Sequence, residues 1–314
     1  MNARVLLVGD MTDRLLAVAA RLPAAPILLT SAAELPRAPL LIEHLPETNR
    51  PRRETLLRDR LRHLIEVHEI GTVVLDGVPE DGLLAATADH PGVTWLWLRP
   101  AMWRRGQGLR WRGRSAAFDA VLEPGEFATA GDEGWTVYDR EGVTTVAPIT
   151  ALDRADLLDR AAARERLGLG DEPAVVCRGL TTTVPGFTVI EPEARALRAA
   201  DLAVATAGYT AYHELLAAGV PTVFVPDEDA GPDDQLARAR FAAAAGAALC
   251  AERAADLADL LALAARPEVR AALASRCAEV AFENGASAAA EWVGSRASPA
   301  SPASPAPTGR GPRS

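Results

Sequence analysis

Apolar runs and amphipathic stretches alternate along the first half of the chain. The short apolar runs predict strands, which lie at Val5–Val8, Ile27–Thr30, Leu40–Glu43, Thr72–Leu75, Thr94–Leu98 and Ala120–Glu123. Helical spacing is found between them near residues 12–22, 50–68 and 80–89, and a hairpin with its turn at residues 139–142 is predicted to follow. Strands that alternate with helices are typical of a doubly wound α/β domain, which we expect to span residues 1–150.

The pattern changes after Pro148 and Asp153, where a charged helical segment is predicted over residues 154–167. At 314 residues the chain exceeds the usual size of one domain, so we expect a second domain over residues 151–295. The remaining residues, 296–314, are rich in Pro and Ser and show no apolar period. We expect them to form a disordered tail.

Residues 201–241 carry the most informative pattern, because strand, glycine turn, helix, strand and acidic loop follow one another directly. Gly208 lies where the N–H groups at the start of the helix can face a diphosphate. Glu214 lies further along the helix, where its carboxylate can accept hydrogen bonds from ribose hydroxyls. The acidic loop ends in polar groups suited to sugar hydroxyls, at Asp233, Asp234 and Gln235. The segment therefore predicts a nucleotide-sugar pocket.

This segment resembles the carboxyl-terminal domain of the GT-B glycosyltransferases, within the group that contains the peptidoglycan N-acetylglucosaminyltransferase and its actinobacterial relatives. The resemblance implies an α/β protein with two Rossmann-like domains facing a cleft, a UDP-sugar as donor substrate, and no metal or other cofactor. It also implies which residues contact the donor: Ala207, Gly208 and Tyr209 at the diphosphate, Glu214 at the ribose, Asp234 and Gln235 at the sugar, and the backbone of Val189 and Ile190 at the uracil ring.

Each of these residues also has a simpler structural interpretation. A glycine before a helix is commonly a plain connection, and Glu214 alone could be a solvated helix residue. Residues 233–235 could cap the helix that follows them. His213 precedes Glu214 directly, so the two side chains point to different helix faces, and we interpret His213 as a packing or rim residue and not as a catalytic partner. It is the joint occurrence of these features that favours a donor site.

The chain departs from the family in the loop after the first strand, which is glycine-rich in the relatives and often ends in a histidine. Here Asp10 and Asp13 are the ionisable groups of that loop. Either carboxylate could be the general base for an acceptor hydroxyl, or both could be turn and capping residues. His44 and Asp76 are further candidates for contact with substrate, because each ends a strand at the sheet edge where such folds bind ligands.

A second departure concerns the connection between the strands predicted at residues 174–177 and 187–190. Only nine residues separate these strands, whereas the family usually has a helix and a further strand there. A crossover between parallel neighbours generally needs about a dozen residues or more. We therefore expect one βα unit to be missing, with fewer strands in the second domain and a donor pocket that lacks one wall.

Composition narrows the class of partner. The net charge of −9 argues against non-specific binding to nucleic acid. Residues 99–114 form a basic run with tryptophans, which could stack bases, lie on an anionic bilayer or remain a solvated loop. We favour a fourth interpretation, in which this run borders the interdomain cleft, because a similar segment of the actinobacterial relatives lies there.

Cysteine usage and hydropathy bear on location. The three cysteines, Cys177, Cys250 and Cys277, are widely spaced in apolar surroundings, which predicts reduced thiols in a cytoplasmic protein. The amino terminus enters a strand at once, and no apolar segment reaches the length of a membrane span. We expect a soluble protein, and peripheral contact with the inner membrane face stays open.

The function expected from these features is transfer of a hexose or N-acetylhexosamine from a UDP-sugar to an acceptor hydroxyl. The acceptor is not identified by the sequence, and a lipid-linked or cell-envelope glycan is one candidate. Two alternatives stay open: an inactive relative that binds a nucleotide-sugar or a partner protein, and an epimerase of the same architecture. The altered first loop and the missing unit motivate the inactive alternative.

Overall fold

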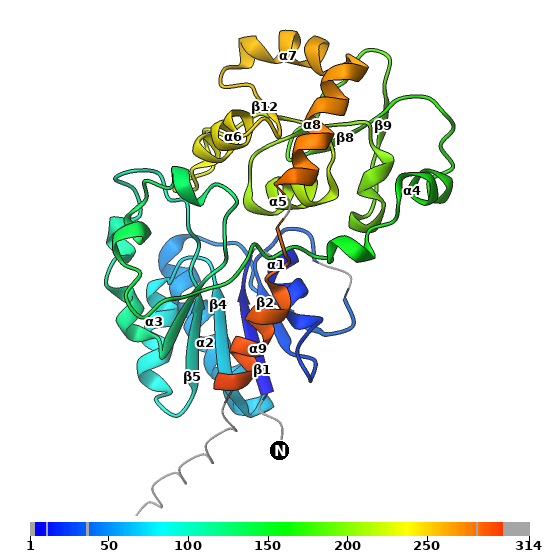
Figure 1. Cartoon of the computed structure of the whole chain (residues 1–314). Coiled ribbons are helices and arrows are strands. Elements are labelled where there is room, and N and C mark those ends of the chain that lie inside the picture. Colours follow the sequence, from blue (N-terminus) through cyan, green and yellow to red (C-terminus); the bar gives the residue numbers. More distant parts are fainter. Residues whose placement is uncertain (1–3, 11, 36–37, 281, 298–314) are drawn as a thin grey trace, which may run out of the picture.

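A computed structural model of the chain describes residues 4–10, 12–35, 38–280 and 282–297. It contains two α/β units, one above the other in Figure 1, and each unit is built on its own sheet. β1 (Arg4–Gly9) begins at the end of the lower unit that faces away from the upper one and runs toward the upper unit (Figure 1), so the carboxyl ends of its parallel neighbours face that unit too.

The first sheet has seven strands in the order β3-β2-β1-β4-β5-β6-β7, and all its pairings are parallel. After β1, its strands are β2 (Ile27–Thr30), β3 (Leu41–His44), β4 (Ile70–Asp76), β5 (Thr94–Leu98), β6 (Ala120–Glu123) and β7 (Thr144–Thr145). All seven residues of β4 are buried, as expected of a central strand that helices cover on both faces.

Alternation of side chains along β1 builds two separate cores. Leu6 and Val8 point to the face covered by α2 (Arg50–His68) and α3 (Asp81–Asp89). Val5 and Leu7 point to the opposite face, where α1 (Thr12–Ala19) packs. The period of two therefore divides one apolar strand between both layers of the unit. The predicted doubly wound α/β domain is confirmed.

The structure contains the six predicted strands of this unit and contradicts the predicted hairpin. β7 pairs with β6 in parallel, with Leu122 opposite Thr144, so the chain crosses over instead of turning back. The buried side chain of Arg99 reaches Asp139, donating to its carboxylate over 2.7 Å and to its backbone oxygen over 2.6 Å. This arginine fixes residue 139 in an irregular connection at the place where the hairpin turn is predicted.

The second sheet has five parallel strands in the order β12-β11-β10-β8-β9. These strands are β8 (Ala174–Arg178), β9 (Thr188–Ile190), β10 (Leu202–Ala205), β11 (Thr222–Phe224) and β12 (Leu249–Cys250). The helices of this unit are α4 (Arg160–Arg166), α5 (Tyr209–Ala218), α6 (Gln235–Ala244), α7 (Leu257–Ala264) and α8 (Pro267–Glu279).

The connection from β8 to β9 is nine residues long and contains no helix, as predicted. Its Val184 is buried and packs in the apolar cluster on one face of the sheet, together with the partly buried Leu180 and Phe187. These side chains cover the sheet where a crossover helix would otherwise lie. Nine residues therefore suffice for this parallel crossover because the connection supplies its own apolar cover.

The helix predicted over residues 154–167 is interrupted. A short 3₁₀ turn at Arg154–Asp156 precedes α4, and Asp159 caps α4 by accepting a hydrogen bond from the N–H of Ala162 over 2.8 Å. Between them the N–H of Leu158 donates to the carbonyl of Arg195 over 3.0 Å. This backbone pairing draws the chain out of helical geometry before the cap restarts the helix.

The last described helix, α9 (Ala286–Arg296), returns to the lower unit (Figure 1). Trp292 and Val293 are buried in the same cluster as α1, so residues 286–295 pack on the first sheet although the predicted boundary groups them with the second domain. Asn284 ties together the two chain segments that pass between the units, bonding the N–H and the carbonyl of Thr150 over 3.1 and 3.0 Å. Residues 298–314, most of the predicted disordered tail, lie outside the described residues.

No helix within the described ranges is both long and apolar enough to span a membrane. The longest of them, α2, has 19 residues and is strongly polar.

Candidate functional site

The turn between β10 and α5 lies where the sequence predicts a diphosphate site. Gly208 is the residue before α5, with φ of −63° and ψ of 151°. The carbonyl of Ala207, which is buried, accepts a hydrogen bond from Arg238 over 3.3 Å. A side chain added at Gly208 would meet only the amide of Gln235, at 3.6 Å. The turn is therefore fixed from behind by Arg238, while Gly208 has open space beside it.

Glu214 lies in the second turn of α5 and points toward the connection between the two units. Its Oε1 accepts a long hydrogen bond of 3.4 Å from the N–H of Ala151. Burial raises the pKa of Glu214 to about 7, and the nearby carboxylate of Asp13 adds to the effect. A hydroxyl that donated to this carboxylate would relieve both unfavourable effects. The residue is thus suited to accept hydrogen bonds from a bound polyol.

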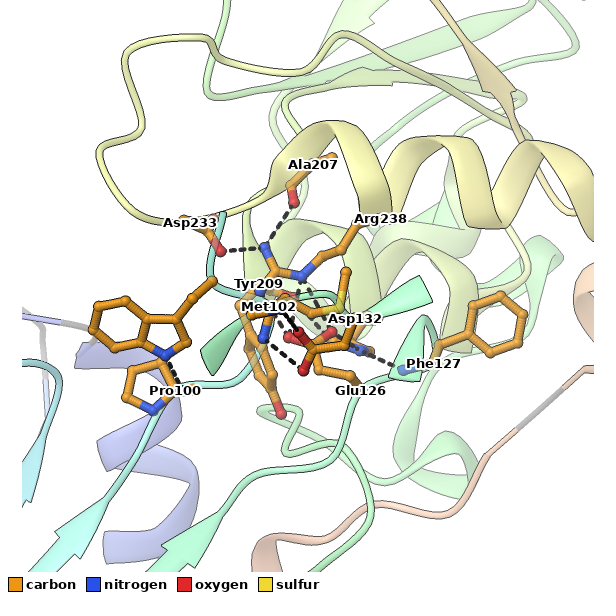
Figure 2. Close-up of polar contacts among 12 residues, drawn as sticks. Pro100, Met102, Glu126, Phe127, Asp132, Ala207, Tyr209, Asp233 and Arg238 are labelled. Atoms are coloured by element: carbon orange, nitrogen blue, oxygen red, sulfur yellow. Dashed lines mark hydrogen bonds and ion pairs between the residues drawn. The ribbon is translucent and has the colours of Figure 1, made fainter. Parts of the chain in front are cut away.

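A buried ion pair holds α6 against the first unit (Figure 2). Arg238 of α6 donates to both oxygens of Glu126, at 2.7 to 3.1 Å, and to Asp233 at 2.5 Å. Arg238 is 1% exposed and Glu126 8%. Glu126 follows β6, so the pair connects the loops of one unit to the helix of the other. Burial opposes the charge of Arg238, but attraction to Glu126 and Asp233 outweighs it and raises the pKa of Arg238.

His213 completes this cluster. Its Nδ1 lies 2.8 Å from the carbonyl of Tyr209, and its Nε2 lies 3.1 Å from the N–H of Phe127. A carbonyl can only accept, so Nδ1 carries a proton, while Nε2 also lies 3.2 Å from Oε2 of Glu126. The His213 side chain is fully buried, in agreement with the packing role predicted for it.

The basic run at residues 99–114 borders the second unit, as predicted. Asp234 donates its N–H to the carbonyl of Met102 over 2.8 Å, and Arg104 donates its N–H to Pro232 over 2.7 Å. The Arg104 side chain donates to the carbonyls of Asp227 and Glu228. Met102 is buried and has a φ of 56°, an uncommon conformation for a residue other than glycine. The acidic loop is therefore bonded to the first unit along its length.

A cavity of about 250 Å³ lies in the first unit, at the carboxyl ends of β1, β2 and β4. Asp10 lines it, with Oδ1 accepting from the N–H and the hydroxyl of Ser31, each over 2.8 Å. Asp76 also lines it, but this buried carboxylate is bonded through both oxygens to Arg14. The structure thus brings Asp10 to a ligand-sized space and removes Asp76 as a free acid or base.

The other predicted site residues are placed as follows. Asp13 is exposed in the first turn of α1, and His44 is exposed at the end of β3, an edge strand. Asp234 caps α6 by accepting a hydrogen bond from the N–H of Ala237 over 3.0 Å. The helix-capping role that the sequence offers as an alternative is therefore present in the structure. Gln235 is buried and accepts from the N–H of Asp227 over 3.1 Å.

Val189 and Ile190 lie in β9, at the opposite edge of the second sheet from β12. Val189 is half exposed and Ile190 is buried. The proposed diphosphate turn follows β10, and β8 lies between β10 and β9. These two residues are therefore one strand removed from the turn.

Sequence reasoning missed Arg14, Glu126 and Arg238. Each lies in a stretch that reads as an ordinary charged helix or loop, and no spacing distinguishes it from a solvated residue. One signal was available for Arg14: Asp76 ends the most apolar strand of the chain, and a buried carboxylate at such a position requires a cation nearby.

Residues 168–286, which include β8 to α8, match the glycosyltransferase family 28 C-terminal domain. A search of curated protein sequences finds no significant match to the chain.

Among solved structures, the chain is similar to MurG of Acinetobacter baumannii, with a TM-score of 0.61 and 16% identity over 93% of this chain and 99% of that one. It is similar to the glycosyltransferase SsfS6 of Streptomyces sp. SF2575, with a TM-score of 0.60 and 15% identity over 93% and 99% of the two chains. It is also similar to Os79 of O. sativa, solved in complex with UDP, with a TM-score of 0.64 and 12% identity over 94% and 100% of the two chains.

Proposed function

We propose that this chain, which has the GT-B fold and carries a glycosyltransferase family 28 C-terminal domain at residues 168–286, transfers a sugar from a nucleotide diphosphate donor to an acceptor hydroxyl. The donor we propose is a UDP-hexose or UDP-N-acetylhexosamine. The observation that carries the proposal is that Gly208 directly precedes α5 while Glu214 lies in its second turn, inside the matched domain.

The turn at Gly208 and the carboxylate of Glu214 bind different parts of the donor. N–H groups at the start of α5 and the positive end of its dipole stabilise a diphosphate, both when it is bound and when it leaves. The carboxylate of Glu214 accepts hydrogen bonds from the ribose hydroxyls. Gln235 lies against Gly208 and contacts the sugar in this proposal, whereas Asp234 acts through the start of α6.

In this proposal the first unit binds the acceptor. Asp10, at the mouth of the cavity, accepts the proton of the acceptor hydroxyl as the hydroxyl oxygen attacks the anomeric carbon of the sugar and the diphosphate departs. The proposed reaction uses the nucleotide-sugar alone and no further cofactor. A cytoplasmic location, where nucleotide-sugars would be at hand, is part of the same proposal.

Calorimetric titration of UDP and UDP-N-acetylglucosamine tests the donor site. Gly208→Val should abolish close approach of the diphosphate without disturbing the fold, because the nearest atom to the new side chain's Cβ is 3.6 Å away. Gly294→Val is the matched control, since Gly294 lies on α9 with open space around it. Glu214→Ala should cost about 1.5–3 kcal/mol, roughly ten- to a hundredfold in affinity.

Unchanged UDP affinity in both Gly208→Val and Glu214→Ala would remove this site from consideration. Binding of UDP-sugars without turnover toward a broad panel of acceptor alcohols would favour an inactive relative that binds a nucleotide-sugar.

A further inference from the structure

The cavity at the carboxyl ends of β1, β2 and β4 is walled mainly by apolar side chains. Leu45, Leu57 and Leu83 come from three different segments and are each at most 4% exposed. Leu29 and Leu75 complete the wall from β2 and β4. A leucine-lined cavity of about 150 Å³ in another protein takes up benzene, so a space of about 250 Å³ accommodates a larger ring.

The polar groups of the cavity lie together on one side. They come from Asp10 and Ser31, which follow β1 and β2, and from Arg53 and Glu80, on and beside the two covering helices. Asp10 Oδ1 is held by Ser31, while Oδ2 lies 3.6 Å from Arg53 Nη2. Oδ2 is thereby left to accept a proton from a ligand. The cavity thus combines an apolar interior with a polar side that presents the Asp10 carboxylate.

The charge of this lining disfavours anions. Arg53 is the arginine of the lining, and Glu80 binds it through three contacts of 2.9 to 3.0 Å, while Ser31 takes a further N–H at 2.9 Å. Asp10 and Asp76 add two more carboxylates, of which Asp76 is neutralised by Arg14. A phosphate entering the cavity would face Asp10 and Glu80 with no guanidinium released from its partners.

We propose that this cavity binds the acceptor, and that the acceptor is an uncharged, largely apolar ring alcohol whose hydroxyl meets Asp10. The inference rests on the proposed glycosyl transfer and narrows its substrate class. It disfavours the lipid-linked acceptor considered from the sequence wherever such a lipid carries its phosphate into the cavity. Arg14 bonds Asp76, which lines the cavity, and also lies over the ring of Tyr209 at the start of α5. One buried arginine therefore separates the cavity from the start of α5.

A matched pair of probes tests the proposal without any donor present. 2-Naphthol and 2-naphthyl phosphate share one ring system, and the second carries a charged phosphate in place of the hydroxyl hydrogen. Their binding to the full chain is measured by calorimetry. We expect 2-naphthol to bind at least about tenfold more tightly, because the phosphate would be held against the like charges of Asp10 and Glu80.

Variants locate the binding. Leu57→Trp fills the cavity and should weaken 2-naphthol at least about tenfold. Val67→Trp is the control, because Val67 lies on the same helix and is 58% exposed. Glu80→Gln frees Arg53 from its carboxylate partner and should strengthen 2-naphthyl phosphate by about tenfold while leaving 2-naphthol unchanged.

The proposal is overturned if neither probe binds, if the phosphate binds as tightly as the alcohol, or if Leu57→Trp and Val67→Trp behave alike. UDP titration of the same proteins separates these results from failure of the proposed function. Variants that lose 2-naphthol but keep UDP affinity support an acceptor cavity, and a parent chain that binds 2-naphthol but no UDP-sugar contradicts the glycosyl transfer on which the inference rests.

Discussion

The guanidinium of Arg14 lies 4.5 Å from the ring centroid of Tyr209 and bonds both carboxylate oxygens of Asp76. Arg14 belongs to α1 of the first unit and Tyr209 opens α5 of the second. The Tyr209 hydroxyl accepts from the N–H of Ile149 over 2.8 Å and donates to the carbonyl of Gly125 over 3.1 Å. The start of α5 is therefore attached to the first unit at several points.

Arg14→Met should destabilise the chain strongly. The change leaves the buried carboxylate of Asp76 without its cation, for which a loss of about 3–5 kcal/mol is expected. Urea unfolding measures this loss. Addition of Asp76→Asn should recover part of it, since the orphaned charge is then removed. Arg58→Met is the control, because Arg58 forms an exposed pair with Asp89, and it should change stability far less.

Glu214 predicts a pH dependence of folding. Its pKa of about 7 lies above the ordinary 4.5, so in this range the folded chain holds a proton that the unfolded chain releases. This contribution is fully present below about pH 4.5 and is lost as pH rises through 7, to a total of up to about 3 kcal/mol. When stability is measured between pH 4.5 and 8, the parent should lose up to about 3 kcal/mol of unfolding free energy relative to Glu214→Gln, which has no proton to release. A constant difference would contradict the expectation.

The Glu126–Arg238 pair predicts a loss of folding stability at acid pH. Burial alone would raise the pKa of Glu126, but Arg238 and His213 outweigh it and lower the pKa to about 2. The stabilisation is present above the unfolded value near 4.5 and is lost as pH falls toward 2. Glu126→Gln should cost about 3–5 kcal/mol at pH 7 and flatten the acid limb of a stability profile. Glu252→Gln, in an exposed pair with Arg240, should preserve that limb.

Asp10→Asn tests the general base. The amide oxygen keeps the hydrogen bonds from Ser31 but cannot take a proton, so turnover should fall about a hundredfold or more while UDP affinity stays the same. Asp13→Asn is the comparison, since Asp13 is not among the residues that line the cavity. Loss of turnover in Asp13→Asn and not in Asp10→Asn would assign the base to α1.

The strands and long helices of this chain could be predicted because their signals are local. An apolar run marks β4, and Asn49 before Pro51 marks the start of α2, where the Asn49 side chain accepts from the N–H of Arg52. The parallel pairing of β7 could not be predicted in this way. It depends on Arg99, which lies forty residues before its partner Asp139.

The residues of the candidate site likewise differ in whether their signals are local in the sequence. The sequence places Gly208 and Glu214 close together because Gly208 directly precedes the helix that carries Glu214. The cavity around Asp10 could not be predicted, since it forms only when α2 and α3 close over the sheet. Likewise Arg238 reads as a helix-surface residue, and its role depends on a loop more than a hundred positions earlier in the chain. A charged residue that is buried only by tertiary contacts does not change the apolar period of the sequence around it.

The return of α9 to the first sheet has a consequence for biosynthesis. Leu7, Val74 and Leu96 share one sheet face with Trp292 of α9, so part of this face is uncovered until nearly three hundred residues have been made. A fragment that ends at residue 150 would carry an exposed apolar surface, which favours aggregation. The first unit is thus the last to be completed, and it should express as a stable fragment only when the α9 segment is supplied with it.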